Sequence, residues 1–191
     1  MTDLDTAAPA FVAMAHSIVW ASIATVDRAG RPRTRILHPY WVWEDGALTG
    51  WVATVPTPTK RAHIARNPYV SCNYWAPTHD TCAAECRADL LFDAEVRTRV
   101  WNLFRDSPEP LGYDPAAIGV PGWYAPTSPD FAVMRLAPWR LRVFPGTSAV
   151  NGTGTAGGSG PEDGVLTWQQ PAGPGAVPPG PDREGPDAAF A

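Results

Sequence analysis

Basic and hydroxyl side chains gather in one short stretch of the sequence, where they can bind an anion. Arg35 stands in a segment that partly alternates polar and apolar residues, and Thr57, Thr59 and Lys60 follow in the stretch VPTPTKRAHIARNP. A phosphate dianion is held best by a guanidinium fork, an ammonium point charge and hydroxyl or backbone N–H donors. These residue types at this spacing therefore predict a phosphate-binding site.

Two strands and a short helix are expected to position these side chains. Residues Arg33–Trp43 are predicted to form a strand whose one face carries Arg33, Arg35 and Leu37. A tight Asp-Gly turn leads to a second strand over Ala47–Thr54, as in a β-hairpin. Residues Lys60–Arg66 are predicted to be helical with Thr59 as the N-cap, and the N-terminus of a helix attracts an anion.

The remaining elements are mostly short strands. Successive hairpins favour an antiparallel meander. The irregular segment 107–130 holds six prolines and is expected to form a pocket or an interface. Ala137-Pro138 predicts a bulge or bend between the last two strands. The other expected elements are helices over Pro9–Ser17 and from Asp93 to about Arg105, and strands over Ile18–Val26, Tyr69–Trp75, Thr81–Leu91, Phe131–Leu136 and Trp139–Phe144.

The chain of 191 residues is expected to form one folded domain and a tail. Residues 1–145 form the predicted domain. Residues 146–191 are rich in Gly and Pro and are expected to be largely disordered, apart from a short strand at Val165–Trp168.

The net charge of −4 argues against binding to nucleic acid, because the basic residues are scattered among acids. No apolar run approaches the roughly 18 to 20 residues that a membrane span needs, and the N-terminal residues MTDLDTAAPAF are acidic where a signal peptide is basic. The sequence therefore predicts a cytoplasmic protein with no membrane segment.

The three cysteines, Cys72, Cys82 and Cys86, are an odd number in a chain for which no export is predicted. Reduced, buried thiols are therefore expected. His79 lies near Cys82 and Cys86, but this spacing lacks a C-x-x-C knuckle and a fourth ligand, so no metal site is predicted.

Two segments carry a resemblance to a known family. ATVDRAGRPRTRILHPYW and, after a glycine hairpin, VATVPTPTKRAHIARNPYVSCNYW resemble the pyridoxamine 5'-phosphate oxidase-like superfamily of split-barrel flavoproteins. The resemblance covers about Ile18 to Phe144. It implies a mainly β (α+β) fold, an antiparallel Greek-key split β-barrel with a few short helices. It also implies a homodimer with flavin mononucleotide (FMN) sites at the subunit interface.

The family's cofactor-binding positions fall on identifiable residues of this chain. Tyr40 stands where a lysine is expected, a glutamine expected early in the fifth strand falls near Cys82, and the C-terminal His-x-Arg pattern of true pyridoxamine phosphate oxidases is absent. Vitamin B6 synthesis is therefore not predicted. The resemblance implies that Arg35 contacts the flavin phosphate and that Thr54 supplies a hydroxyl. It also implies that Ile36, Leu37 and His38 lie beneath the isoalloxazine ring. The basic pair that the family has before the short helix falls on Thr59 and Lys60, so only the lysine of that pair is kept.

Three functions stay open at this point. The first is an FMN-dependent oxidoreductase that acts on a small molecule, with Arg35, Thr54, Thr57, Thr59 and Lys60 holding the cofactor. No catalytic side chain is assigned, because a flavin carries the hydride chemistry itself. The second is a reductase that uses the deazaflavin coenzyme F-420, which also has a phosphate and a tricyclic ring. The third is a non-catalytic protein that binds flavin or haem, the latter through His38 or another axial histidine.

Overall fold

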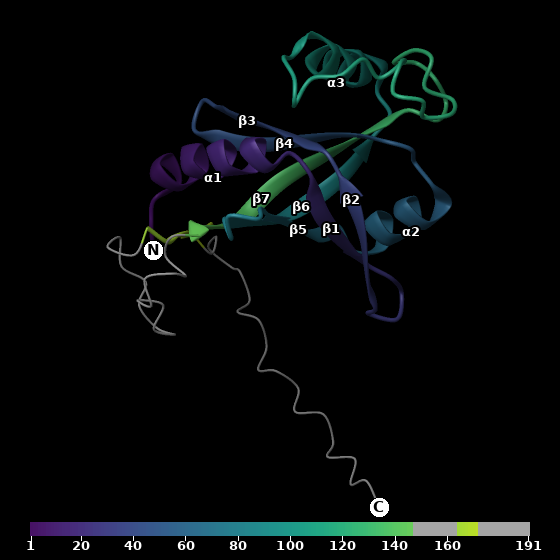
Figure 1. Ribbon diagram of the computed structural model, residues 1–191. Coiled ribbons are helices and arrows are strands. Elements are labelled where there is room, and N and C mark those ends of the chain that lie inside the picture. Colours follow the sequence, from purple (N-terminus) through teal and green to yellow (C-terminus); the bar gives the residue numbers. More distant parts are fainter. Residues whose placement is uncertain (147–163, 172–191) are drawn as a thin grey trace, which may run out of the picture.

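The computed structural model describes residues 1–146 and 164–171, so the predicted tail lies mostly outside the described residues. Three helices and eight strands make up this part of the chain (Figure 1). They are α1 (Leu4–Ile18), β1 (Ala21–Val26), β2 (Pro32–Leu37), β3 (Pro39–Glu44), β4 (Ala47–Thr54), α2 (Pro58–Arg66), β5 (Tyr69–Trp75), β6 (Thr81–Leu91), α3 (Ala94–Asp106), β7 (Ala132–Phe144) and β8 (Leu166–Gln169).

All strands belong to one antiparallel sheet with the order β2-β1-β5-β6-β7-β4-β3, and β8 pairs with β7. Only His38 separates β2 from β3, yet these strands lie at opposite ends of that order. The sheet must therefore curl until its two edges meet at His38, which produces an open barrel. The predicted fold class, a mainly β split barrel with a few short helices, is confirmed.

The predicted meander is wrong, because β1 pairs with β5 and β4 pairs with β7. The segment Arg33–Trp43 was expected to be one strand, and it breaks at His38-Pro39 instead. Proline lacks a backbone N–H and is suited to the first residue of an edge strand, so the chain leaves one edge of the sheet and starts the other at Pro39.

Several other boundaries differ from the prediction in ways that packing explains. The first helix is longer than expected and runs to Ile18, so the following strand starts only at Ala21. The last two predicted strands form the single strand β7. Its pairing with β6 shifts between Glu85 and Cys86, opposite Pro138 and Arg140, so the predicted bulge is present. Strands β4, β5 and β6, and the short strand β8, occur where the sequence predicts them.

Helix α1 packs against the inside of the curled sheet and closes the main core. Phe11 lies edge-on to the rings of Trp41 and Tyr74, at centroid distances of 5.0 and 6.2 Å. The Nε1 of Trp41 donates a hydrogen bond to the Tyr74 hydroxyl at 2.8 Å, so this buried pair leaves no polar atom unsatisfied. The three cysteines are buried in the same core, as predicted.

A second apolar cluster lies under α3, which Asp93 caps as the sequence predicts. Trp101 and Trp123 both meet the ring of Phe131 edge-on, at 4.9 and 5.0 Å. The irregular segment between α3 and β7 therefore packs on α3 and covers one end of the barrel (Figure 1). No helix of the described residues is long and apolar enough to cross a membrane.

Gly50 allows β4 to lie against the Trp41 ring, and its replacement tests this contact. A Cβ atom at Gly50 would lie 2.8 Å from Cζ3 of Trp41. Because Trp41 is buried and hydrogen-bonded, its ring has little room to move. We expect Gly50→Ala to lower the free energy of unfolding by about 1–3 kcal/mol, measured by urea denaturation.

The matched control places Gly50→Ala in a Trp41→Phe background, where the smaller ring relieves the overlap. The cost of the alanine should then fall by at least half. An equal cost in both backgrounds would show that the tryptophan ring is not the source of the strain.

Candidate functional site

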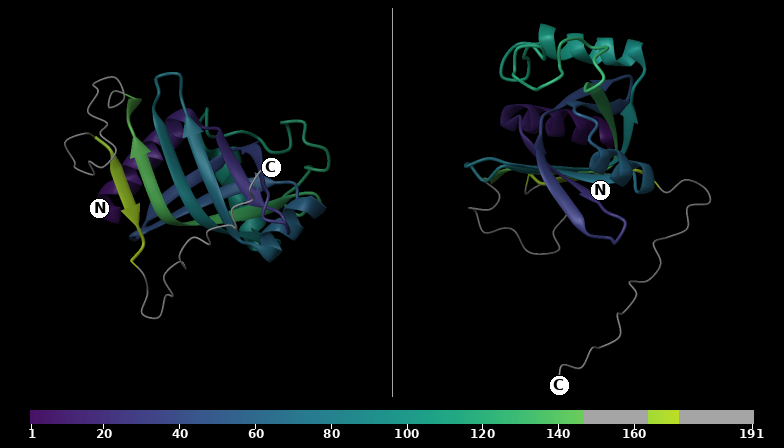
Figure 2. Two further views of the ribbon diagram at one scale, coloured as in Figure 1. Left: turned by 90° about the horizontal axis from the view of Figure 1, so that it is seen from below. Right: turned by 90° about the vertical axis from the view of Figure 1, so that its right-hand side faces the viewer.

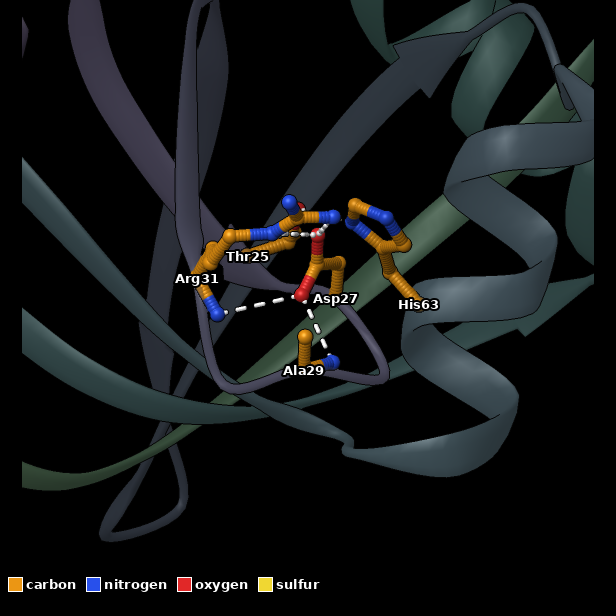
Figure 3. Close-up of polar contacts among 5 residues, drawn as sticks. All are labelled: Thr25, Asp27, Ala29, Arg31 and His63. Atoms are coloured by element: carbon orange, nitrogen blue, oxygen red, sulfur yellow. Dashed lines mark hydrogen bonds and ion pairs between the residues drawn. The ribbon is translucent and has the colours of Figure 1, made fainter.

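A carboxylate orders the turn between β1 and β2. The Oδ1 of Asp27 accepts hydrogen bonds from the backbone N–H groups of Ala29, at 2.8 Å, and Arg31, at 3.1 Å (Figure 3). Arg31 Nε also donates to Oδ2 at 2.8 Å. The hydrogen bond from the Arg31 backbone leads these interactions in lowering the pKa of Asp27 to about 2. The ordered turn fixes a register in which Thr25 pairs with Arg33 and is the diagonal neighbour of Arg35.

Thr25 links Arg35 to helix α2. The Nη1 of Arg35 donates to Thr25 Oγ1 at 3.0 Å, and this oxygen lies 2.9 Å from Nδ1 of His63 (Figure 3 shows the Thr25–His63 pair). Thr25 is 1% exposed, so both contacts are protected from water. Desolvation, and then the charge of Arg33, lower the pKa of Arg35. Because arginine ordinarily loses its proton only far above neutral pH, the group stays cationic.

Lys60 is the single lysine of the chain and is buried. Its Nζ donates hydrogen bonds to Thr54 Oγ1 and to the carbonyl oxygen of Val55, the latter at 2.8 Å. Helix α2 starts earlier than predicted, with Thr57 rather than Thr59 as the N-cap, and Thr57 Oγ1 accepts from the Lys60 backbone N–H at 3.3 Å. Proline suits the first turn of a helix, so Pro58 moves the start upstream.

Arg35 and Lys60 have no acidic partner in the part of the chain that the structure describes. No carboxylate there lies within 4.0 Å of either group. Burial, followed by the charge of Arg35, lowers the pKa of Lys60 to about 8. Two neighbouring cations with neutral hydrogen-bond partners form a site that attracts an anion. We call Arg35, Thr54, Thr57 and Lys60 the cation site.

Three predicted residues lie outside this group. Ile36 is 63% exposed on the opposite face of β2, Leu37 packs against the main core, and Thr59 is exposed on the first turn of α2. Side chains alternate between the two faces of a strand, so Arg35 and Ile36 cannot face the same ligand from the same side.

His38 belongs to an aromatic cluster instead. Its ring lies 5.2 Å from Trp20, 5.6 Å from Phe104 and 5.5 Å from Tyr113, measured between centroids. It is buried, and its Nε2 has no hydrogen-bond partner. Desolvation, and then the charge of His16, lower its pKa to about 4, so His38 is neutral near pH 7. This cluster joins the edge of the barrel to α3.

The sequence analysis did not identify Thr25 or the contact that His63 makes with it. The signal for Thr25 was present, since β1 alternates Ala21, Ile23 and Thr25 toward the interior, and a polar residue in such a row needs a partner. His63 follows Lys60 by three positions, which places both on the same side of α2.

Solved structures share this fold, whereas no family model and no curated protein matches the chain. A protein of Clostridium acetobutylicum related to general stress protein 26, of the pyridoxinephosphate oxidase family, has a TM-score of 0.60 at 11% identity, over 88% of this chain and 96% of that one. A pyridoxamine 5'-phosphate oxidase-related, FMN-binding protein of Nostoc punctiforme has a TM-score of 0.54 at 18% identity, over 76% and 86%. The protein Rv2991 of Mycobacterium tuberculosis has 0.54 at 17%, over 83% and 94%. At these identities the likeness establishes the fold.

The pKa of Lys60 can be measured without ambiguity because the chain contains no other lysine. We expect lysine labelled with ¹³C at Cε to give one side-chain NMR signal that titrates near pH 8. The folded state then binds fewer protons than the unfolded state between about pH 8 and the ordinary value of 10.5, so stability rises with pH across this window.

Addition of inorganic phosphate should raise this pKa, since an anion favours the charged amine. The same titration of urea-unfolded protein is the control and should give an ordinary lysine value. A folded-state value near 10.5 would contradict the burial of the charge.

Proposed function

From the split-barrel fold that the chain shares with pyridoxamine 5'-phosphate oxidase-like proteins, we propose that it is an FMN-dependent oxidoreductase acting on a small molecule. The observation that carries this proposal is the buried Lys60 beside Arg35, with no carboxylate of the described residues near them. A flavin phosphate supplies the negative charge that balances these two cations.

The donors of the cation site suit a phosphate monoester. The guanidinium of Arg35 donates one N–H to Thr25, and the ammonium of Lys60 donates two to Thr54 and Val55. Both groups therefore retain donors for a ligand. The first turn of α2 adds the positive end of the helix dipole and the backbone N–H of Thr59, since Pro58 has no N–H and those of Lys60 and Arg61 donate to Thr57. Charge-assisted bonds of this kind are the strong ones.

When bound, the flavin supplies hydride transfer, and the chain's own residues hold and orient it. The aromatic cluster of His38, Phe104 and Tyr113 excludes water at one edge of the barrel. His38 is neutral near pH 7 and offers a polar atom without adding charge. We assign no catalytic side chain, and the cytoplasm stays the predicted location.

Two other cofactors fit particular observations. The deazaflavin coenzyme F-420 also carries a phosphate, and Tyr40 in place of a lysine keeps this reductase activity as an alternative. Haem, in a non-catalytic binding protein, has a candidate ligand in His38, whose Nε2 is buried and unpartnered. An absorption spectrum of the purified protein, with mass spectrometry of the small molecule that heat releases, separates these three cofactors.

The double variant Arg35→Ala/Lys60→Ala tests the cation site. Each lost charge-assisted hydrogen bond costs about 1.5–3 kcal/mol, so FMN affinity should fall at least a hundredfold, as measured by fluorescence titration. Circular dichroism should still show a folded barrel. Burial of the Lys60 ammonium costs free energy in the native state, so its removal should lower stability little.

Arg33→Ala is the matched control, since Arg33 is an exposed arginine two residues away on the same strand. It should leave FMN affinity within about twofold of the wild type, given how little an exposed charge contributes. If the double variant binds FMN as tightly as the control does, the assignment of the cation site is wrong.

We also propose that the protein is a homodimer that pairs through the outer face of its sheet. One row across this face holds Ile36, Ser22, Asn73, Ala83 and Arg142, which are neighbours on β2, β1, β5, β6 and β7. Seen from below, the strands lie in front of α1, which covers only their other face (Figure 2, left). Small side chains around exposed apolar ones such as Ile36 favour packing of one sheet on another.

Ala83→Arg should break this dimer, because it adds a second long cation beside Arg142, and two neighbouring charges without a counter-charge are costly to bury between two sheets. Sedimentation equilibrium should give the monomer mass for this variant and the dimer mass for the wild type. Arg142→Ala, which shortens a neighbour in the same row, is the control and should stay dimeric. A dimeric Ala83→Arg variant would exclude this face as the interface.

A further inference from the structure

We propose that a second ligand site lies in the groove between α2 and the end of β6, and that it binds a small organic anion with an apolar body. The groove encloses about 580 Å³, which suits a small molecule. We call it the arginine groove. The residues that line it include Arg61, Arg87, Asp89, Leu90, Phe92 and Arg135.

The rim of the arginine groove carries more positive than negative charge. Asp89 pairs with Arg135, at 2.8 Å, and with Arg87, at the longer distance of 3.6 Å. Arg61 has no carboxylate within 4.0 Å among the described residues. The groove thus carries three guanidinium groups and one carboxylate, and this excess of positive charge favours an anionic ligand. Asp89 also holds two of the three guanidinium groups in place, which reduces the cost of ordering them on binding.

The interior of the groove is apolar. The guanidinium carbon of Arg61 lies 5.0 Å from the centroid of the Phe92 ring, and Phe92 is 43% exposed. Leu90 and Leu91, which are half-buried, also line the groove. An aromatic or acyl group can therefore cover Phe92 and these leucines, while its acidic group pairs with the arginines. A free inorganic ion would leave this apolar surface exposed to water.

This site is distinct from the cation site although it shares a helix with it. Lys60 and Arg61 are adjacent in α2, but Lys60 points to Thr54 and Val55 at the end of β4, whereas Arg61 lies on Phe92 beyond β6. The helix thus places cations toward two different sites, and a ligand in the arginine groove binds in addition to the proposed flavin.

The test uses 8-anilinonaphthalene-1-sulfonate, which joins one sulfonate to an aromatic body, in an NMR titration of the full ¹⁵N-labelled chain. We expect saturable shifts of the backbone amides of Ile64, Ala88 and Leu90, with one probe bound per chain. The uncharged analogue N-phenyl-1-naphthylamine has the same body without the sulfonate. It should bind at least tenfold more weakly, because it carries no negative charge to pair with the arginines.

The double variant Arg61→Gln/Arg87→Gln should weaken binding of the sulfonate at least tenfold and that of the neutral analogue by less than threefold. Arg66→Gln, an exposed arginine of α2 outside the groove, is the matched control and should bind as the wild type does.

Three results would overturn the proposal. The first is equal binding of the two probes to the wild type, a result that does not depend on whether a variant folds. The second is full affinity of the double variant for the sulfonate. The third is a set of shifts that maps outside the arginine groove, including the case in which a second copy of the chain covers it and excludes the probe.

Discussion

Burial of a lysine ammonium among neutral groups costs free energy, and this cost at Lys60 constrains the surrounding structure. The charge is held by the Thr54 hydroxyl and the Val55 carbonyl, and the nearby Arg35 opposes it rather than balancing it. Such an arrangement persists when the rest of the fold is stable enough to support it. It is useful when an anion completes the charge balance, because the two cations are then already in position.

The barrel places these groups by bringing separate segments together. Thr25 comes from β1, Arg35 from β2, Thr54 from β4 and Lys60 from α2. The Asp27 turn fixes the pairing of β1 with β2, and a shift of one residue would turn Arg35 to the outer face. Helix α1 fills the interior of the curled sheet, so the rigid core supports a site at its margin.

The aromatic cluster around His38 shows how Pro39 affects both the order of the strands in the sheet and the surroundings of the His38 ring. The break at Pro39 ends one sheet edge and starts the other, and it leaves His38 between them. Its ring then packs against Trp20 from the α1–β1 link, Phe104 from α3 and Tyr113 from the following segment. His38, one of the three residues expected beneath the isoalloxazine ring, thus lies where three parts of the chain converge.

Local residue patterns were sufficient to predict β4, β5, β6, the Asp93 cap and the bulge at Ala137-Pro138, because hairpin turns, caps and bulges depend on near neighbours in sequence. The basic and hydroxyl character of residues 33–60 was likewise visible in the sequence. The contacts between distant residues could not be predicted from the sequence. The pairing of β1 with β5, the Thr25–His63 contact and the arginine groove all join residues far apart in the chain. Long-range strand pairing is decided by burial of the whole core, so only the tertiary structure determines which charged groups meet and which remain without a counter-charge.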